Sequence, residues 1–405
     1  MLIAARESFA VASRRRPRMV RVQYIESTGT QWIDTGVKIA LTDRVAVDFA
    51  RTGSASDTNG AACGARVSYA AANGFAIWAV TSANTARFDL TASSSQYVTT
   101  SATVTVGTRH VAEKTGTANR LDGYDVTGNG TVSSYSPQYN AYLFAVNQAG
   151  SAAFPAKMRL YAATIGDKRD FVPVRVGNAG YLYDRVSGQL FANAGTGSFA
   201  VGPDAPFDSS VEYLGFDGAQ YIDTGYTAYG EFAMDMEFMI TQIAGNTVYS
   251  GVRSSSQLLH VPQVAGEGGN FRFYYGAGEV PSVEMAVATL NVRHVAHAQL
   301  TRALRVCEVD GRVIARAATS VSPMTSDMSI YVGKRNYYGA SDTVQAMVGR
   351  LYGFRLFCNG TYVRDLQPVR SGGVGYVWDS VTNTLLANAG TGSFSVGPTS
   401  TRRTA

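Results

Sequence analysis

Two short acidic patterns in this 405-residue chain have a spacing that catalysis could use. Glu308 and Asp310 are separated by one residue, and so are Asp235 and Glu237. In a β-strand such residues point to the same face, so both carboxyl groups of a pair enter one groove. Two carboxyl groups beside a glycosidic bond are the machinery of glycoside hydrolysis, one as general acid and one as nucleophile or base.

Other chemistry has less support in the sequence. His110 and His294 occupy matching R-H-V-A positions without a sequence neighbour that could act with them, so we expect strand-capping or edge-strand histidines. No nucleophile elbow, P-loop or dinucleotide fingerprint occurs. Isolated D-T-G and D-G motifs do not make a calcium site, although a site built by ligands from distant loops remains an alternative. The sequence predicts no cofactor and no metal.

The three cysteines, Cys63, Cys307 and Cys358, form no C-x-x-C pair, which argues against zinc. We expect them to be buried, because free cysteine is among the most buried residue types. A Cys307–Cys358 disulfide remains an alternative.

The chain contains an internal repeat. Q-W-I-D-T-G begins at Gln31 and Q-Y-I-D-T-G at Gln220, and Asp170–Pro203 matches Asp365–Pro398 at 21 of 34 positions. Such a repeat indicates two copies of one structural unit. We expect a basic arm at 1–21, domains at 22–203 and 211–398, a linker at 204–210 and a tail at 399–405.

Within each copy the hydrophobic pattern has the period of a strand. Val45, Val47 and Phe49 alternate with smaller or polar residues, and D-G turns separate such runs. The fold class is therefore predicted as all-β, two tandem antiparallel β-sandwiches with a short N-terminal arm. The ends of the copies match best, so we expect the first and last strands of each unit to lie side by side. In the repeated phrase, isoleucine is expected in the core and Asp34 and Asp223 in a turn that glycine completes.

The charge distribution separates a basic arm from a nearly neutral body. The net charge is +5, but residues 1–21 hold six arginines against Glu7, and the tail adds Arg402 and Arg403. A nucleic-acid-binding body would carry its own basic face, so no nucleic acid partner is expected. No apolar run is long enough to span a membrane, and the N-terminus lacks the order of a signal peptide. The arm is either an anchor, with residues 2–13 as a short helix or flexible segment, or a solvated leader.

Three segments of the first copy carry a family resemblance: Y-I-E-S-T-G-T-Q-W-I-D-T-G, D-F-V-P-V-R, and G-Y-L-Y-D-R-V-S-G-Q-L-F-A-N-A-G-T-G-S-F, starting at Tyr24, Asp170 and Gly180. In them the chain resembles concanavalin A-like, laminin-G-like jelly-roll domains of the type found in gut bacteria and their phages. The second copy keeps the same landmarks more loosely, and the resemblance covers about 22–203 and 211–398. It implies jelly-roll sandwiches that bind glycans or protein surfaces.

Some relatives hydrolyse β-glucans, and the resemblance implies that such enzymes carry three acids in the order E-x-D-x-x-E. Neither acidic pair of this chain has a third acid, and neither is repeated intact in the other copy. We therefore expect no enzyme, with a β-glucan hydrolase of jelly-roll type as an alternative.

Two places have the residues of a sugar site, an exposed aromatic ring beside hydrogen-bonding side chains. Aligning G-F-A-I-W-A-V with N-F-R-F-Y-Y-G pairs Trp78 with Tyr274, although Trp78 is equally readable as a packed residue. The second place is G-K-R-N-Y-Y-G-A-S, expected as a loop after a strand and otherwise as a plain solvated loop. The candidate ligand-binding residues are Trp78, Arg272, Tyr274, Lys334, Arg335, Asn336, Tyr337 and Tyr338.

The function predicted from these features is non-catalytic binding of a glycan or cell-surface polysaccharide. The chain is expected in a virion or outside a cell, as a phage adhesion or decoration protein whose arm contacts other virion proteins. A secreted or surface bacterial carbohydrate-binding protein is the alternative. Decoration without sugar binding and a homo-oligomer also remain open.

Overall fold

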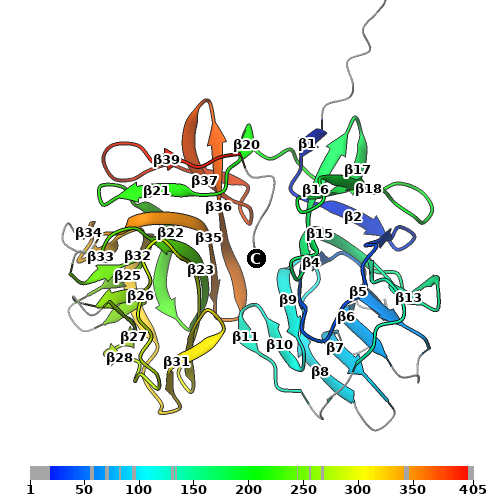
Figure 1. Ribbon diagram of the computed structural model, residues 1–405, viewed down its shortest axis with the longest axis horizontal. Coiled ribbons are helices and arrows are strands. Elements are labelled where there is room, and N and C mark those ends of the chain that lie inside the picture. Colours follow the sequence, from blue (N-terminus) through cyan, green and yellow to red (C-terminus); the bar gives the residue numbers. More distant parts are fainter. Residues whose placement is uncertain are drawn as a thin grey trace, which may run out of the picture.

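The computed structural model describes residues 19–54, 59–68, 73–81, 84–93, 97–128, 132, 135–243, 245–254, 257–265, 269–341 and 346–399. In these ranges the chain folds into two β-sandwiches that lie beside one another (Figure 1). Within the same ranges no helix is long and apolar enough to cross a membrane. The segment 2–13 that we predict as a helix or flexible arm, and the tail beyond 399, lie outside the described residues.

The first sandwich consists of two sheets, which we call inner sheet 1 and outer sheet 1. The described strands of inner sheet 1 are β1 (Met19–Arg21), β2 (Ile25–Thr28), β4 (Arg44–Arg51), β9 (Arg109–Thr115), β10 (Ala118–Leu121), β11 (Tyr124–Asp125), β15 (Lys157–Ile165), β16 (Arg169–Val176), β17 (Ala179–Asp184), β18 (Gln189–Phe191) and β19 (Ala200–Val201). Those of outer sheet 1 are β3 (Ile33–Asp34), β5 (Gly60–Arg66), β6 (Gly74–Val80), β7 (Thr85–Thr91), β8 (Tyr97–Thr103), β12 (Tyr142–Leu143), β13 (Val146–Gln148) and β14 (Ser151–Ala153).

The second sandwich repeats this plan with inner sheet 2 and outer sheet 2. The described strands of inner sheet 2 are β20 (Ser209–Ser210), β21 (Leu214–Asp217), β23 (Phe232–Ile240), β29 (Arg293–Leu300), β30 (Arg305–Val309), β31 (Arg312–Ala317), β35 (Val348–Cys358), β36 (Thr361–Ser371), β37 (Val374–Asp379), β38 (Thr384–Leu386) and β39 (Ser395–Val396). Outer sheet 2 consists of two hydrogen-bonded groups of strands that lie side by side where β25 contacts β26. The first group is β22 (Ile222–Gly230), β32 (Met324–Val332), β25 (Ser250–Arg253), β33 (Arg335–Tyr337) and β34 (Ala340–Ser341), and the second is β24 (Thr247–Val248), β26 (Leu258–Ala265), β27 (Asn270–Gly276) and β28 (Gly278–Glu279).

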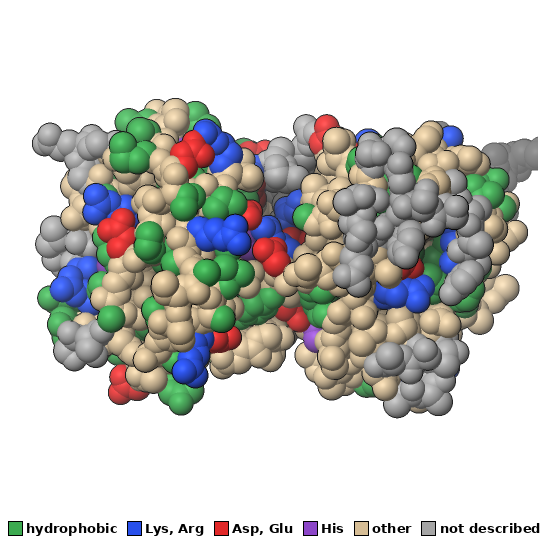
Figure 2. Space-filling model, turned by 90° about the horizontal axis from the view of Figure 1, so that it is seen from below, with side chains coloured by type: hydrophobic (Ala, Val, Ile, Leu, Met, Phe, Trp, Pro, Cys, Tyr) green, Lys and Arg blue, Asp and Glu red, His purple; other side chains and the backbone are tan. Residues whose placement is uncertain are grey.

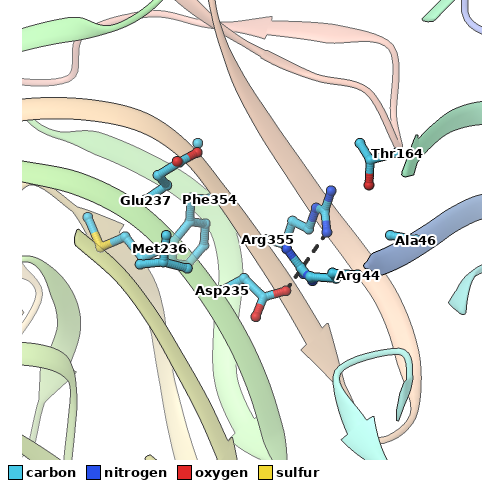
Figure 3. Close-up of a pocket in the computed structure, with 10 residues that line it drawn as sticks. Arg44, Ala46, Thr164, Asp235, Met236, Glu237, Phe354 and Arg355 are labelled. Atoms are coloured by element: carbon cyan, nitrogen blue, oxygen red, sulfur yellow. Dashed lines mark ion pairs between the residues drawn. The ribbon is translucent and has the colours of Figure 1, made fainter. Parts of the chain in front are cut away.

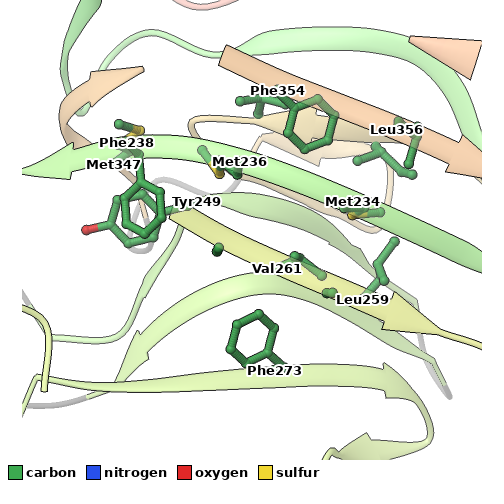
Figure 4. Packing of buried hydrophobic residues seen from close by; sticks show 14 of the residues in the cluster. Met234, Met236, Phe238, Tyr249, Leu259, Val261, Phe273, Met347, Phe354 and Leu356 are labelled. Carbon is green, nitrogen blue, oxygen red and sulfur yellow. The ribbon is translucent and has the colours of Figure 1, made fainter. Parts of the chain in front are cut away.

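Each sandwich has its own core because alternate residues of facing strands point inward. In the second sandwich, side chains of β23 point toward those of β26 and β27 (Figure 4). The facing residues that the view labels are Met234, Met236, Phe238, Leu259, Val261 and Phe273. The first sandwich is built in the same way, with Val45, Val47 and Phe49 in its core, as the period-two pattern predicts. The three cysteines are free and buried, so the Cys307–Cys358 disulfide does not form.

The first and last strands of each unit pair, as the similarity of their sequences predicts. β19 pairs with β2 in the first sandwich, and β39 pairs with β21 in the second. The repeated phrase lies beside this closure: Ile33 and Ile222 are fully buried, and the Asp34 and Asp223 carboxylates accept from the main-chain N–H two residues later, at 2.8 and 2.9 Å. The segment that the two copies share therefore has a structural role.

The sheet of the first sandwich already begins in the arm. β1, at residues 19–21, pairs with β16, and β20 in the linker pairs with β36 in the corresponding place. The arm and the linker thus each contribute the same short strand to the unit that follows them.

The two inner sheets face each other, so the order of layers is outer sheet 1, inner sheet 1, inner sheet 2, outer sheet 2 (Figure 1). Val111 of β9 packs with Ala233, Phe357 and Tyr362 of the second sandwich. Most of the seam around this apolar cluster is polar, and Figure 2 shows basic and acidic side chains gathered between the two lobes. Among them, Arg120 of the first sandwich pairs with Glu308 of the second at 2.7 Å. Both outer sheets are left facing away from the seam.

Candidate functional site

The candidate site is the face of outer sheet 2 that points away from the core, which we call the outer face. It consists of the side chains of Arg253, His260, Arg272, Tyr274, Glu279, Arg335, Tyr337 and Tyr338. Val252, Leu259 and Phe273 are in the core, so strand alternation turns the neighbouring side chains of β25, β26 and β27 outward. Arg335 and Tyr337 lie on the same face because they pair with Gly251 and Arg253, and Tyr338 is exposed in the turn that follows. The structure thereby brings together, on one face, the two groups of candidates that the sequence places 60 residues apart.

A row of side chains crosses the outer face at right angles to its strands. Arg335 is paired with Gly251, His260 with Tyr274, and Tyr274 with Glu279. Gly251 links the two halves of the row, since a Cβ there would lie 3.1 Å from the His260 ring. With neighbouring strands about 4.8 Å apart, the row from β33 to β28 is roughly 19 Å long.

Polar side chains mark one end of the row. The Tyr274 hydroxyl donates to Glu279 at 3.2 Å, and the Arg272 guanidinium lies 3.5 Å from the same carboxylate oxygen. Burial, opposed by Arg272 and reinforced by Glu279, raises the pKa of Tyr274, so its hydroxyl stays protonated. The hydrogen bond with Tyr274 and the charge of Glu279 raise the pKa of Arg272. This end offers a cation, a hydroxyl and a carboxylate in fixed positions.

Two tyrosines on the hairpin of β33 and β34 mark the other end. Tyr337 is 39% and Tyr338 54% exposed, with ring centroids 4.5 Å apart and the rings nearly perpendicular. The Arg335 and Arg253 guanidinium groups lie 4.8 and 5.6 Å from the centroid of the Tyr337 ring. Stacking against arginine restricts the ring, so Tyr337 is held in place while one side stays open to solvent.

The first sandwich builds the same hairpin without aromatic residues. Its β13 and β14 form a hairpin in which Gln148 and Ala149 occupy the places of Tyr337 and Tyr338. Ala149 and Tyr338 share a positive φ of 53°, a strained conformation for residues other than glycine. Asn147 and Asn336 fix the two turns identically, each accepting from the glycine three residues later. The hairpin therefore does not need the tyrosines.

Three predicted residues beside these tyrosines are buried, which corrects the expectation of a solvated loop. Lys334 precedes β33, Arg335 and Asn336 lie within it, and their exposed fractions are 6%, 5% and 3%. The segment is a strand because it pairs in parallel with β25. Asn336 is structural, since its amide donates to Ser329 O at 2.9 Å, and Lys334 packs near Tyr221.

Trp78 is not an open platform, and its predicted correspondence with Tyr274 is wrong. β6 lies next to β5, whereas β27 lies one strand further from β25, because β26 intervenes. Trp78 points away from the core but is only 1% exposed. Phe154 packs against its edge, and Arg66 and Arg87 lie over its ring at 5.7 and 4.6 Å. The alternative reading of Trp78 as a packed residue is the correct one.

The acidic pairs of the sequence lie elsewhere, at the seam between the sandwiches. Asp235 and Glu237 line a small cleft of about 80 Å³, together with Arg44 of the first sandwich and Arg355 of β35 (Figure 3). Glu237 pairs with Arg293, and Asp235 accepts from His297 at 2.7 Å and lies 4.0 Å from Arg355.

The electrostatics of this cleft keep Asp235 ionised. Burial by itself raises the pKa of Asp235, but the hydrogen bond from His297 and the charges of His297, Arg355 and Arg44 outweigh it and hold the pKa well below its usual value. An ionised carboxylate with these partners is an ion-pair member, and it has no proton to donate to a leaving group.

The second acidic pair is structural. Asp310 is the turn residue of the β30–β31 hairpin, and its carboxylate lies 2.8 Å from His294 Nδ1. Asp122 and His110 repeat this contact at 2.7 Å in the first sandwich. Spacing along the chain does not reveal either partner, because each aspartate lies 12 or 16 residues from its histidine, in the D-G turn of the following hairpin. No cluster of metal-ligating side chains occurs among the described residues.

No protein-family model matches this chain, and neither does a curated protein sequence. Solved structures do align with it. Domains LG4-5 of the mouse laminin α1 chain cover 85% of this chain and 91% of their own length, at 15% identity and a TM-score of 0.29. A Bacteroides ovatus protein, provisionally named as a carbohydrate-binding protein, covers 95% of this chain and 93% of its own, at 9% identity and a TM-score of 0.36.

The binding domain of botulinum neurotoxin serotype D covers 85% of this chain and 78% of its own length, at 9% identity and a TM-score of 0.25. Identities and TM-scores this low carry no conclusion about what this chain binds. The sheet topology of the chain itself establishes its fold, an all-β tandem of two β-sandwiches.

Proposed function

We propose that the protein is a non-catalytic glycan-binding protein and that the outer face binds the glycan. The observation that carries this proposal is the Tyr337–Tyr338 pair, exposed on a hairpin that the first sandwich builds with Gln148 and Ala149. Exposed aromatic residues that the fold does not need have another use, and exposed large apolar side chains commonly mark binding sites.

The chemistry of the outer face fits a sugar better than an apolar ligand. The open side of an aromatic ring packs against the apolar face of a sugar ring. Arg272, Tyr274 and Glu279 supply a cation, a hydroxyl and a carboxylate for the hydroxyl groups of a sugar at the other end of the row. A row of roughly 19 Å is longer than one sugar ring, which favours an oligosaccharide lying across the strands.

We propose further that the protein does not cleave its ligand. The support is the state of the acids at the seam. A general acid for glycoside hydrolysis needs a raised pKa, whereas the pKa of Asp235 is lowered, and Glu237 is held by Arg293. Release of reducing sugar from β-glucan by the wild type, abolished in Glu237→Gln, would instead establish the hydrolase alternative.

We propose a place outside cells, in a phage virion, as the setting for this binding, with a secreted or surface bacterial protein as the alternative. The support is the sequence, a basic arm before two domains of a binding type. Mass spectrometry of purified particles would detect the chain if it is a virion component, and its absence from particles would favour the bacterial alternative.

An array of defined neutral and acidic oligosaccharides tests the glycan proposal. We expect the wild type to bind a structurally related set of chains and Tyr337→Gln to lose that set. Binding to no chain on the array, or binding that is equal in both proteins, would contradict the proposal. Tyr181→Gln, a change of a partly exposed tyrosine on β17 of the first sandwich, is the matched control and should bind as the wild type does.

A further inference from the structure

Arg305, the first residue of β30, has an unusual position for a charged side chain. It alternates with Cys307 and Val309, which are in the core, so its side chain points into the open end of the second sandwich between the two sheets. The residue is only 4% exposed.

The guanidinium of Arg305 lacks an acidic partner among the described residues. Its Nη2 donates to the Thr319 hydroxyl at 2.9 Å, and its buried Nη1 has no hydrogen-bond partner. A buried cation without a counter-ion is costly because it has given up its hydration without a compensating charge. Arg109, which is also buried, is paired with the carboxylate of Asp48, whereas Arg51 has the neutral partners Asn84 and Ser54 O. A negatively charged group from outside the chain would supply the missing counter-charge.

A cavity beside Arg305 has room for that group. It has a volume of about 500 Å³, opens to solvent, and lies between the end of β27 and the segment after β31. Gly278 borders open space, since a Cβ there would meet nothing within 4 Å. Thr319, Ser322 and Gln257 add hydroxyl and amide groups to the lining.

One acidic residue, Glu279, also lines the cavity, and its carboxylate is committed to the outer face. It accepts from the Tyr274 hydroxyl and pairs with Arg272, so it does not neutralise Arg305. Glu279 therefore stands between the outer face on one side and the cavity on the other, which makes the two regions continuous.

We propose that this cavity binds an anionic group, a carboxylate, sulfate or phosphate, with Arg305 as its counter-ion. The planar guanidinium presents N–H donors in a fork that matches two oxygens of such a group. The Thr319 hydroxyl orients the fork, and the Ser322 hydroxyl supplies a further donor. The anionic group is either an acidic sugar of the glycan on the outer face, in which case the inference rests on the proposed function, or a free small anion.

The described part of the first sandwich has no buried arginine in the corresponding place, where Ala118 begins β10, and it serves as an internal comparison. Its β9–β10 hairpin closes by pairing Thr115 with Ala118, whereas β29 and β30 extend to a longer connection after Leu300, with Arg305 as its partner. The arginine thus arises where the second copy is longer than the first.

Thermal unfolding of the whole chain tests the anion site, with sodium glucuronate and sodium sulfate as probes against sodium chloride at equal ionic strength. We expect glucuronate or sulfate to raise the Tm of the wild type saturably by several degrees beyond chloride. Arg305→Met should start from a higher Tm, because the unpaired buried charge is gone, and lose the anion-specific increment. Arg316→Met, which removes an exposed arginine of the neighbouring strand, should respond as the wild type does. An equal increment in Arg305→Met, or none in the wild type, would overturn the proposal.

Two further variants keep the test independent of folding and of the outer face. Thr319→Val changes an exposed residue and should weaken the response to anions several-fold. It therefore tests the site even if Arg305→Met does not fold. Tyr337→Gln should keep the full response to free glucuronate even where it abolishes oligosaccharide binding. If instead Thr319→Val and the wild type respond equally to both anions, the site is wrong even when the outer face binds glycan.

A uronic-acid oligosaccharide distinguishes the two sources of the anion. Binding at least tenfold tighter than that of its neutral analogue, with the advantage lost in Arg305→Met, assigns the cavity to the glycan. Equal binding of the two oligosaccharides, with the response to free glucuronate retained, assigns it to a small anion. Either result supports the anion site, and a charge advantage that survives Arg305→Met contradicts it.

Discussion

Arg109 of the first sandwich donates to the main-chain carbonyl of Ser380 in the second at 2.7 Å, while it holds both oxygens of Asp48 at 2.7 and 2.6 Å. Its guanidinium also lies over the rings of Tyr161 and Tyr362, one from each sandwich. This one buried side chain thus contacts both copies, in addition to the apolar cluster at Val111 and the Arg120–Glu308 pair.

Arg109→Met should uncouple the two sandwiches. The variant leaves the Asp48 carboxylate buried without its partner, which we expect to lower the free energy of unfolding by about 3–5 kcal/mol. Scanning calorimetry should then resolve two transitions where the wild type shows one. Arg175→Met, which breaks an exposed pair with Asp204, should leave the Tm unchanged. A single transition at the wild-type Tm in Arg109→Met would contradict the role given to the seam.

The ion pairs of Asp235 should make stability depend on acid pH. Because its pKa is lower in the folded chain than in the unfolded one, its contribution is present above the unfolded value of about 3.9 and is lost as the pH falls through the folded value. The difference in unfolding free energy between wild type and Asp235→Asn should therefore shrink below about pH 4. Asp327→Asn, at an exposed position, should show a flat difference. A difference for Asp235→Asn that is also flat across pH 2–5 would show that the carboxylate is not stabilised by its partners.

The repeated D-T-G should matter for stability and not for binding. Asp223→Ala removes the acceptor of the Gly225 N–H, and we expect a loss of about 1 kcal/mol in the second sandwich, measured by urea denaturation. Asp34→Ala should do the same in the first sandwich. Unchanged stability together with lost glycan binding in Asp223→Ala would show that the repeated segment is a binding site and not a structural turn.

Much of the fold is predictable from the sequence because its signals are local or repeated. Period two places Val45, Val47 and Phe49 in a core, and the stronger similarity at the ends of the copies predicts the pairing of β2 with β19. Gln31 and Gln220 show why those ends vary together. Each side chain crosses from the opening strand to the closing segment, donating to Ser198 O and Ser393 O.

The candidate site is less predictable because exposure depends on neighbours that sequence spacing does not reveal. Lys334 and Arg335 look like loop cations, yet both are buried, at the start of a strand that pairs with β25. Trp78 does point outward, but Phe154, remote in sequence, packs against its edge, and Arg87 lies over its ring. The alignment of Trp78 with Tyr274 fails because matching hydrophobic patterns on neighbouring strands are shifted by one strand, an error that only sheet order exposes.

The contacts between the two sandwiches could not be predicted from the sequence for a different reason. Arg109 and Arg293 stand in identical R-H-V-A segments, but Arg109 meets Ser380 of the other copy while Arg293 pairs with Glu237 of its own. Because the two segments are identical in sequence, the sequence cannot show which arginine contacts the other copy and which pairs within its own.

The most direct test of the account replaces the tyrosine hairpin by the one that the first sandwich already uses. Tyr337→Gln with Tyr338→Ala copies Gln148 and Ala149, a pair that the same backbone accepts at the same φ of 53°, so the Tm should change by no more than about 1–2 °C. Calorimetric titration with an oligosaccharide that the wild type binds should show affinity at least about 100-fold weaker, since two stacking tyrosines contribute roughly 1.4 kcal/mol each. Equal affinity of the folded double variant and the wild type would contradict the claim that the outer face is the binding site.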